Sequence, residues 1–207
     1  MLPVMLDLRG KRVLVVGGGA VGRRKALSAF SAGAAVRVVA LESLHEEFAA
    51  HVSIEWIQAN YHADHLQGMC LVFAAATPAV NDRVALDAIR RGVWVNSASD
   101  PTAGDFTLPA VVRRGELTLA ASTGGAAPAL ARRIREKLER EFDEHLATWI
   151  RLLEMIRPTV RESIADPELR RALLDDFADW PWLERLKAEG EDATRRLMEQ
   201  RIRAAAL

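Results

Sequence analysis

The 207-residue chain has little cysteine, no net charge and no long apolar run, and each absence excludes a class of protein. Its single cysteine, Cys70, cannot form an intrachain disulfide, and the run CLVFAAA around it predicts a buried thiol. The 28 basic and 28 acidic side chains cancel, which argues against the positive field that drives nucleic-acid binding. The start MLPVMLDLRGKR lacks the pattern of a signal peptide, and no apolar run has the length of a membrane span. We expect a cytoplasmic protein that binds neither nucleic acid nor membrane.

What the first half does contain is an alternation of short apolar runs and helical patterns. Several of the runs are apolar throughout, as in parallel strands whose two faces are both covered by helices. Strands are expected at Arg12–Val16, Val36–Ala40, Ser53–Ile57, Leu71–Ala75 and Val93–Asn96, and helices at Ala20–Ala32 and Val80–Arg91. This half therefore predicts an α/β fold with a Rossmann-like, doubly wound parallel sheet.

The pattern changes after Asp105. Phe106–Val112 and Glu116–Ala121 have the composition of strands, and Arg113–Gly115 between them has the length and the glycine of a hairpin turn. From Pro128 onward, apolar residues recur every three or four positions and predict one amphipathic helix of about thirty residues. An apolar helix face of this length must be buried against another surface, so we expect the hairpin and the helix to form a dimerisation region.

Helix-ending residues punctuate the rest of the chain and predict several shorter helices. These boundaries are expected at Pro158, Asp166-Pro167, Trp180-Pro181 and Gly190. The chain therefore divides into three predicted segments: a doubly wound domain at 1–112, a dimerisation region at 113–150 and a small helical C-terminal domain at 151–207.

The first chemical motif is the loop VLVVGGGAVGRRK, which lies between a predicted strand and a predicted helix. Its glycines fit the pattern G-x-G-x-x-G, in which they allow a tight turn, the approach of a pyrophosphate and close packing of helix on strand. The candidate cofactor-binding residues of this loop are Gly17, Gly18, Gly19, Ala20, Val21 and Gly22. The alternative is a packing turn that binds nothing.

Glu42 lies twenty residues after Gly22, where an acid that binds the ribose of NAD is expected. Its position just past a predicted strand also fits a solvated surface residue. Because no arginine stands beside Glu42, the sequence favours NAD over NADP. The basic residues Arg23, Arg24 and Lys25 either assist phosphate binding or lie on a solvated helix face.

A second glycine-rich loop is formed by Ser122, Thr123, Gly124 and Gly125, ahead of the helix predicted from Pro128. Free backbone N–H groups at such a helix start suit a carboxylate or a phosphate. The same residues also fit an ordinary helix start, in which serine and threonine satisfy the backbone. The two readings stay open on local chemistry alone.

No metal site is expected, because the chain has no C-x-x-C pair and His62 and His65 lack a third partner nearby. These two histidines are expected at the surface. The loop SDPTAGDF contains Asp100 and Asp105 close to Pro101, and both aspartates fit the pattern of turn residues.

Three segments together resemble the precorrin-2 dehydrogenase and sirohydrochlorin ferrochelatase family of sirohaem synthesis. They are VLVVGGGAVGRRKA, AAATPAVNDRVA and VNSASDPTAGDFTLPAVVRRGELTLAASTGGAAPALARRIREKLE. The resemblance covers about residues 3–150 and implies an NAD-binding domain, a dimerisation region with strands and a long helix from each subunit, and a helical C-terminal domain. Some relatives carry a uroporphyrinogen methyltransferase as a further domain, which this sequence is expected to lack.

The resemblance also implies roles for individual residues. The family's shared aspartate falls on Asp105, which makes it the expected base when precorrin-2 gives a hydride to NAD and a proton to the enzyme. Thr77 joins the cofactor site, and the loop from Ser122 to Gly125 binds the tetrapyrrole. Asp100 keeps its role in the turn. A homodimer is expected, and Fe²⁺ insertion into sirohydrochlorin stays open because some members only dehydrogenate.

Two other functions compete with the enzyme. An NAD-sensing regulatory domain would use the glycine loop without turnover, although it gives no reason for Asp105. A dimeric interaction protein would use the amphipathic helix predicted from Pro128 to bind a second copy. Failure of the protein to bind NAD would favour this alternative.

Overall fold

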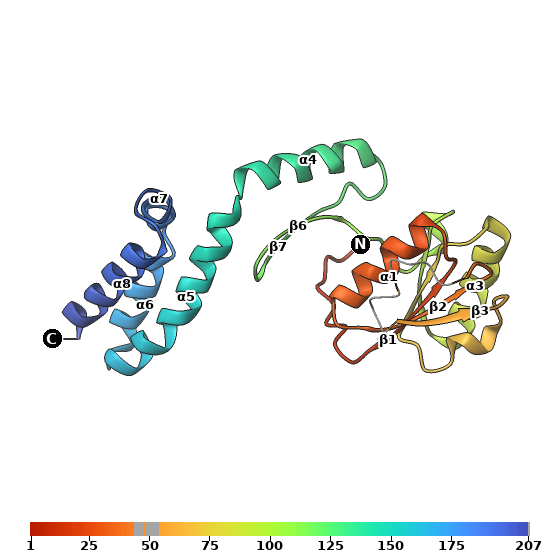
Figure 1. The fold of residues 1–207 in the computed structure, drawn as a ribbon, viewed down its shortest axis with the longest axis horizontal. Coiled ribbons are helices and arrows are strands. Elements are labelled where there is room, and N and C mark those ends of the chain that lie inside the picture. Colours follow the sequence, from red (N-terminus) through yellow and green to blue (C-terminus); the bar gives the residue numbers. More distant parts are fainter. Residues whose placement is uncertain (44–47, 49–53, 207) are drawn as a thin grey trace. The chain divides into compact units, whose positions relative to one another are not determined.

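The computed structural model describes residues 1–43, 48 and 54–206. The chain divides into two compact units, Met1–Leu108 and Pro109–Leu207, drawn in Figure 1. The first unit therefore ends shortly before the predicted boundary at 112, and the further division of the second unit at 150 stays a prediction. Among the described helices, none combines the length and the apolar character that crossing a membrane requires.

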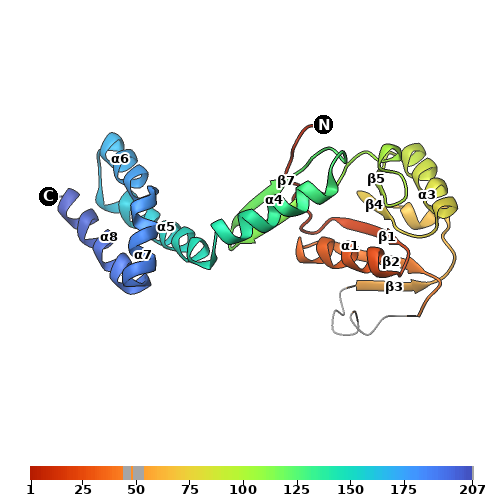
Figure 2. The ribbon, with the colours of Figure 1, turned by 90° about the horizontal axis from the view of Figure 1, so that it is seen from above.

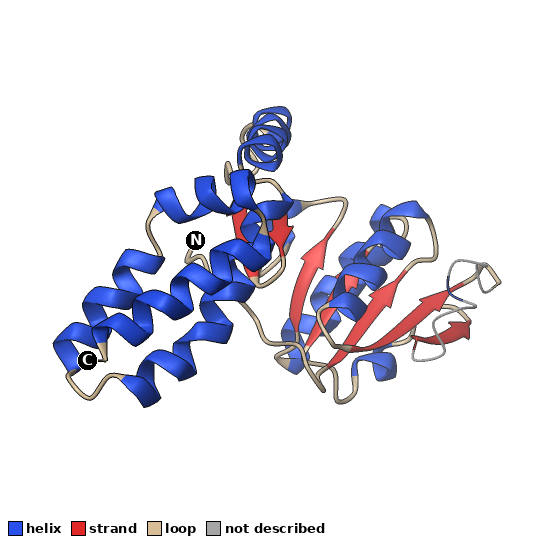
Figure 3. Cartoon of the chain, turned by 60° about the vertical axis from the view of Figure 1, so that its left-hand side comes forward, coloured by secondary structure: helices blue, strands red, loops and turns tan. Residues whose placement is uncertain are grey.

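The first unit contains a parallel sheet, drawn in Figure 3 as the larger group of red strands. It has five strands in the order β3-β2-β1-β4-β5. Its strands are β1 (Arg12–Val16), β2 (Ala35–Ala40), β3 (Ile54–Gln58), β4 (Leu71–Ala74) and β5 (Trp94–Ser97). Its helices are α1 (Ala20–Ser31), η1 (Ala63–Leu66), α3 (Pro78–Arg91) and η2 (Pro101–Ala103). The predicted doubly wound sheet is confirmed, and β1 has the predicted bounds. The start predicted for β3, Ser53, lies outside the described residues.

Both faces of this sheet are buried, which explains why its strands are apolar throughout. Alternate residues of β1 point to opposite sides. Val13 and Val15 belong to the core shared with α1, while Leu14 and Val16 belong to the core shared with α3. The two helices thus cover opposite faces (Figure 2). The strand order reverses between β1 and β4, and ligands of open α/β sheets bind at the carboxyl ends of the strands at such a point.

The second unit begins with a hairpin and continues as helices. Its elements are β6 (Ala110–Arg114), β7 (Leu117–Ala121), α4 (Pro128–Glu141), α5 (Glu144–Ser163), α6 (Pro167–Phe177), α7 (Trp180–Glu189) and α8 (Glu191–Ala205). The predicted strand start at Phe106 is wrong, because the Phe106 carbonyl is bonded to the Asn96 side chain of the first unit's sheet. The turn is also shifted: Arg114 pairs with Leu117, and Gly115 between them has φ +57°.

The single long helix predicted from Pro128 is wrong, since it is broken between α4 and α5. Asp143 caps α5, its carboxylate accepting the N–H of His145 at 3.0 Å. Arg114 of the hairpin holds the end of α4, donating to the carbonyls of Phe142 at 2.8 Å and Glu139 at 3.0 Å. Apolar spacing alone could not reveal this break, because the stripe continues across it.

Pro158 was expected to end a helix, yet it lies inside α5. The opposite face of α5 is buried in the core of the second unit, with Leu152, Ile156 and Val160 among its members. Pro158 is exposed, and so is Glu154, whose carbonyl loses its helical donor to the proline. Packing of the apolar face therefore outweighs the local preference of proline. The boundaries predicted at Asp166-Pro167 and Gly190 are confirmed.

Candidate active site

The glycine loop after β1 is tightly packed at its two ends and open in its middle. Gly17 has φ +113°, and a Cβ there would lie 2.3 Å from the carbonyl oxygen of Ala75. A Cβ on Gly22 would lie 2.0 Å from the carbonyl oxygen of Gly17. Gly19, by contrast, has φ −68° and nothing within 4 Å of its Cβ position. The loop therefore leaves room for a ligand at Gly19 and for nothing at the other two glycines.

The start of α1 faces this open position. Gly19 is the N-cap and offers no side chain to cap the helix, so the first N–H groups are available to an anion. The helix dipole adds partial positive charge there. The guanidinium of Arg23 donates to the carbonyl oxygen of Gly18 at 3.2 Å, which brings a cation to the same loop. A pyrophosphate matches these donors.

Glu42 lies beside the glycine loop. Its Oε2 is 3.1 Å from the position that a Cβ on Gly18 would take, and the residue is exposed. Two side chains of β3 hold this segment: Trp56 Nε1 donates to the carbonyl of Glu42 and Gln58 Nε2 to that of Leu41, both at 3.1 Å. An exposed carboxylate next to the pyrophosphate loop is suitably placed to accept hydrogen bonds from a ribose.

Thr77 is the exposed N-cap of α3, on the loop that follows β4. Asn81 fixes this loop, because its amide accepts from the N–H of Ala76 at 2.8 Å and donates to the Ala76 carbonyl at 3.3 Å. The same amide donates to Ser99 Oγ at 3.1 Å, so the loops after β4 and β5 are tied together. Sequence analysis missed Asn81, whose only signal was an amide inside an otherwise apolar helix face.

Asp105 is clamped to the outer edge of β5 and still exposed. Its Oδ2 accepts the N–H of Val95 at 2.8 Å, and its own N–H donates to the Val95 carbonyl at 2.8 Å. Gly104 allows this approach, since a Cβ there would lie 3.0 Å from the Val95 carbonyl oxygen. The carboxylate is therefore held in one position by the backbone of the sheet. Asp100, in contrast, caps η2 through the N–H of Thr102 at 2.8 Å, which confirms its role in the turn.

Lys25 is neither solvated nor free to reach a phosphate, so both alternatives for this residue are wrong. It is 9% exposed, because its position on α1 faces the sheet. Its ammonium donates to Asn96 Oδ1 and lies 5.0 Å from the centroid of the Phe73 ring. Burial, and then the positive charge of Arg24, lowers the pKa of Lys25 to about 8.

This lowered pKa predicts how stability varies with pH. Between pH 8 and the ordinary Lys pKa of 10.5, the unfolded chain binds more protons at Lys25 than the folded chain, so stability rises with pH through this range. Between pH 7 and pH 10, we expect the free energy of unfolding of wild type to rise by about 1 kcal/mol relative to that of Lys25→Met. This figure is smaller than the full pKa difference would give, because solvent reaches part of the amine. Urea unfolding of both proteins across this pH range measures the gain, and a constant difference would contradict the burial of a charged lysine.

The loop predicted to bind substrate belongs to the second unit. Ser122 Oγ accepts the N–H of Gly124 at 3.2 Å, and Thr123 Oγ1 accepts the N–H of Ala127 at 3.2 Å. Gly124 and Gly125 have φ values of +62° and +88°, and nothing lies within 4 Å of either Cβ position. The loop therefore keeps its shape through its own hydroxyl groups and is open around its glycines. Its role toward a substrate stays a prediction.

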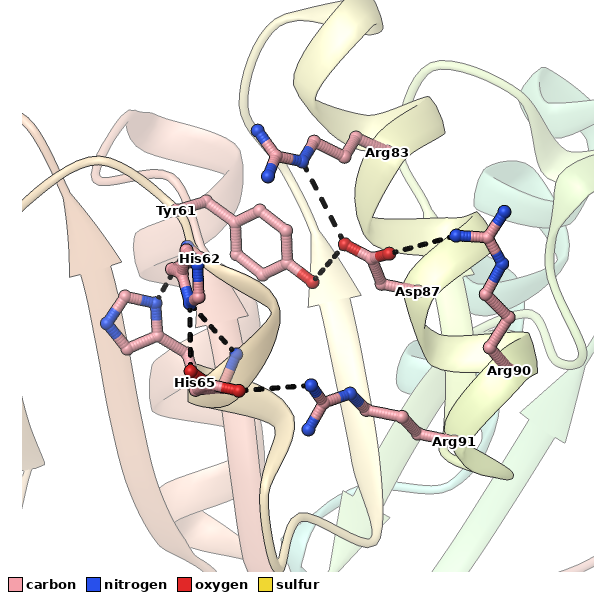
Figure 4. Close-up of polar contacts among 8 residues, drawn as sticks. Tyr61, His62, His65, Arg83, Asp87, Arg90 and Arg91 are labelled. Carbon is pink, nitrogen blue, oxygen red and sulfur yellow. Dashed lines mark hydrogen bonds and ion pairs between the residues drawn. The ribbon is translucent and has the colours of Figure 1, made fainter.

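A cluster of polar side chains around Asp87 connects Tyr61 to α3 (Figure 4). The side chain of Asp87 is 15% exposed and accepts a hydrogen bond from the Tyr61 hydroxyl at 3.3 Å. Arg83 and Arg90 pair with the same carboxylate at 3.9 and 3.8 Å. Burial, followed by the charge of Asp87, raises the pKa of Tyr61 well above its ordinary value. The cluster binds the segment after β3 to α3 and needs no ligand to explain it.

The histidines stabilise a short helix. His65 Nδ1 accepts the N–H of His62 at 3.0 Å, and His62 Nδ1 accepts the N–H of Asp64 at 3.4 Å, so together they cap η1. Within the part of the chain that the structure describes, no three His, Cys, Asp or Glu side chains gather as metal ligands. Cys70 is half-buried rather than buried, and it lines an open surface pocket together with Lys11.

Comparison with known proteins places this geometry in a family. The family model described as "Putative NAD(P)-binding" matches residues 4–110, "Sirohaem biosynthesis protein central" matches 114–141, and "Sirohaem synthase dimerisation region" matches 145–202. The solved structure of "SirC, precorrin-2 dehydrogenase" matches with a TM-score of 0.83 and 30% identity, over 99% of this chain and 100% of that one. The chain belongs to the precorrin-2 dehydrogenase family.

Curated relatives of the precorrin-2 dehydrogenase family include longer proteins. The siroheme synthase of Methylococcus capsulatus is 38% identical over 99% of this chain and 44% of its own length. That of Chromobacterium violaceum is 36% identical over 98% of this chain and 44% of its own length. The chain thus spans less than half the length of these relatives. Membership of the family confirms the resemblance and the expected Rossmann-like domain, and the bounds 113–150 of the dimerisation region stay a prediction.

Proposed function

We propose that the chain oxidises precorrin-2 to sirohydrochlorin with NAD as the hydride acceptor. The observation that carries this proposal is the glycine loop, open at Gly19 and flanked by the Glu42 carboxylate, at the carboxyl end of β1. The full-length similarity to a precorrin-2 dehydrogenase supports the choice of substrate. The family model for NAD(P) binding supports the cofactor.

Glu42 selects NAD over NADP. Its carboxylate accepts hydrogen bonds from the ribose hydroxyls of NAD and repels the phosphate that NADP carries at the same position. We expect Glu42→Gln to weaken NAD binding about tenfold, since a hydrogen bond to a charged group contributes more than one to a neutral amide. Isothermal titration with NAD and NADP measures both affinities. An unchanged ratio of the two dissociation constants in Glu42→Gln would show that Glu42 is only a surface residue.

Asp105 is the proposed base. In the reaction a hydride leaves a C–H bond for NAD, a proton leaves a second bond of the macrocycle for the Asp105 carboxylate, and one new double bond forms. The clamp to Val95 supports this role, because a base is effective when it is held in one position. The loop from Ser122 to Gly125, with its open backbone, is proposed to bind carboxylate groups of the tetrapyrrole.

We further propose that the protein is a homodimer. No residue of α4 is buried within the chain, and its apolar side chains include Leu130 at 52% and Ile134 at 36% exposure. A two-stranded ribbon such as β6–β7 is also marginal on its own. A second copy would cover both. Sedimentation velocity that shows only monomer at micromolar concentration would contradict the dimer.

Formation of NADH from precorrin-2 and NAD distinguishes the proposed enzyme from a domain that only senses NAD. Precorrin-2 generated without oxygen and mixed with NAD and protein is expected to yield NADH, and NAD binding without NADH would favour the sensor. Iron insertion stays a prediction from the family resemblance. Adding Fe²⁺ after oxidation tests it, because an active chelatase forms sirohaem faster than an enzyme-free control.

A further inference from the structure

Lys25 is a buried cation whose observed partners are neutral. On α1 its neighbour Arg24 is a like charge, on β4 it faces the ring of Phe73, and on β5 it faces the amide of Asn96. Among the described residues, the contacts of its ammonium include no carboxylate. Burying a charge without an opposite charge is costly, so the position requires an explanation.

The amide of Asn96 connects Lys25 to the loop that carries Asp105. Asn96 is buried, accepts from Lys25 through Oδ1 and donates through Nδ2 to the carbonyl of Phe106 at 2.8 Å. Phe106 directly follows Asp105, and Val95, which precedes Asn96, makes both clamp hydrogen bonds to Asp105. Two hydrogen bonds and one peptide bond therefore connect the helix that begins at the glycine loop to the proposed base.

Lys25 and the Phe106 carbonyl together fix which way this amide points. An ammonium group only donates hydrogen bonds, so Asn96 must present its oxygen to Lys25 and its nitrogen to Phe106. In the flipped orientation the amide oxygen would face the carbonyl oxygen of Phe106, and the amide nitrogen would face the ammonium. A neutral apolar side chain in place of Lys25 would leave Asn96 Oδ1 without this donor, and the Phe106 carbonyl alone would then orient the amide.

We propose that Lys25 is a positioning residue that holds Asp105 in its reactive position through Asn96 and Phe106. The proposal rests on the proposed function, since it assigns Lys25 a part in the same reaction. The loop around Asp105 does not rely on Lys25 alone to stay folded. Phe106 also packs edge-on against Phe73, with ring centroids 5.6 Å apart. Loss of Lys25 should therefore displace the base without unfolding the loop.

The first test is the kcat of Lys25→Met for precorrin-2 oxidation. We expect kcat to fall about tenfold, with the NAD dissociation constant changed less than about twofold, since a small misplacement of a base slows the chemical step. Lys187→Met on α7 is the matched control, because it makes the same substitution at an exposed lysine of the second unit. Asn96→Asp breaks the same connection at its second link with almost no change in volume, and the same loss of kcat is expected.

A double-mutant cycle shows whether the effect passes through Asp105. In an Asp105→Asn background, Lys25→Met is expected to change the residual kcat less than about twofold, because the group that it positions is already absent. A tenfold loss that persists in that background would overturn the proposal, as would wild-type kcat in both Lys25→Met and Asn96→Asp. Absence of NADH in wild type would instead refute the proposed function itself.

Discussion

Asp105→Asn is expected to lower the kcat of NAD-dependent precorrin-2 oxidation by at least about a hundredfold, while the fold and the NAD affinity stay unchanged. Asparagine has the shape of aspartate, and its oxygen can still accept the N–H of Val95 that Asp105 Oδ2 accepts at 2.8 Å. The clamp to β5 is therefore kept and only the proton-accepting carboxylate is lost. NADH formation under anaerobic conditions measures kcat, and thermal unfolding checks the fold.

Asp105→Ala separates the base from the clamp. Alanine removes the carboxylate and the hydrogen bond that it accepts from the Val95 N–H, but keeps the backbone hydrogen bond to the Val95 carbonyl, so we expect the same loss of kcat with a lower unfolding temperature. If Asp105→Asn retained wild-type kcat while Asp105→Ala lost it, Asp105 would act only by holding the loop. The assignment of Asp105 as base would then be wrong.

The second large effect is expected at the glycine loop, where two similar substitutions should have different consequences. Gly17→Ala places a Cβ 2.3 Å from a backbone oxygen at φ +113°, so we expect a destabilised protein that does not bind NAD. Gly19→Ala introduces no clash and no strain, because φ is −68° and the surroundings are open. Its methyl group instead occupies the space where a pyrophosphate would approach, so NAD affinity should fall at least about tenfold at unchanged stability.

Isothermal titration and thermal unfolding of both variants distinguish these outcomes. Leu86→Ala is the control, because it truncates an exposed side chain of α3 in the same unit and lies outside the glycine loop. This variant should retain both the stability and the NAD affinity of wild type. Wild-type NAD affinity in Gly19→Ala would contradict the placement of the cofactor at this loop.

The sheet and the shape of the glycine loop could be predicted because their signals are local. A strand buried on both faces is apolar throughout, and β1 accordingly has the predicted bounds, Arg12–Val16. Gly17 and Gly22 are required by backbone contacts within this loop and with the loop beside it, so their spacing is visible in the sequence. Glu42 was placed by the same reasoning, at a fixed distance from Gly22.

The rest depended on tertiary contacts that no local pattern records. Lys25 follows two arginines and looks like part of a solvated basic face, and only the position of Asn96 and Phe73 on the sheet shows that it is buried. The break between α4 and α5 depends on Arg114, which lies in a different element and binds the carbonyl of Phe142. In both cases the deciding partner is distant in the sequence.

Hydride transfer from precorrin-2 to NAD is the reaction that we propose for this chain. The most direct measurement follows NADH and sirohydrochlorin together, by absorbance, after precorrin-2 generated without oxygen is mixed with NAD and protein. We expect the two products to appear in equal amounts, at a rate proportional to protein concentration. Sirohydrochlorin formed at the same rate without protein, or NAD bound with no NADH produced, would contradict this proposal.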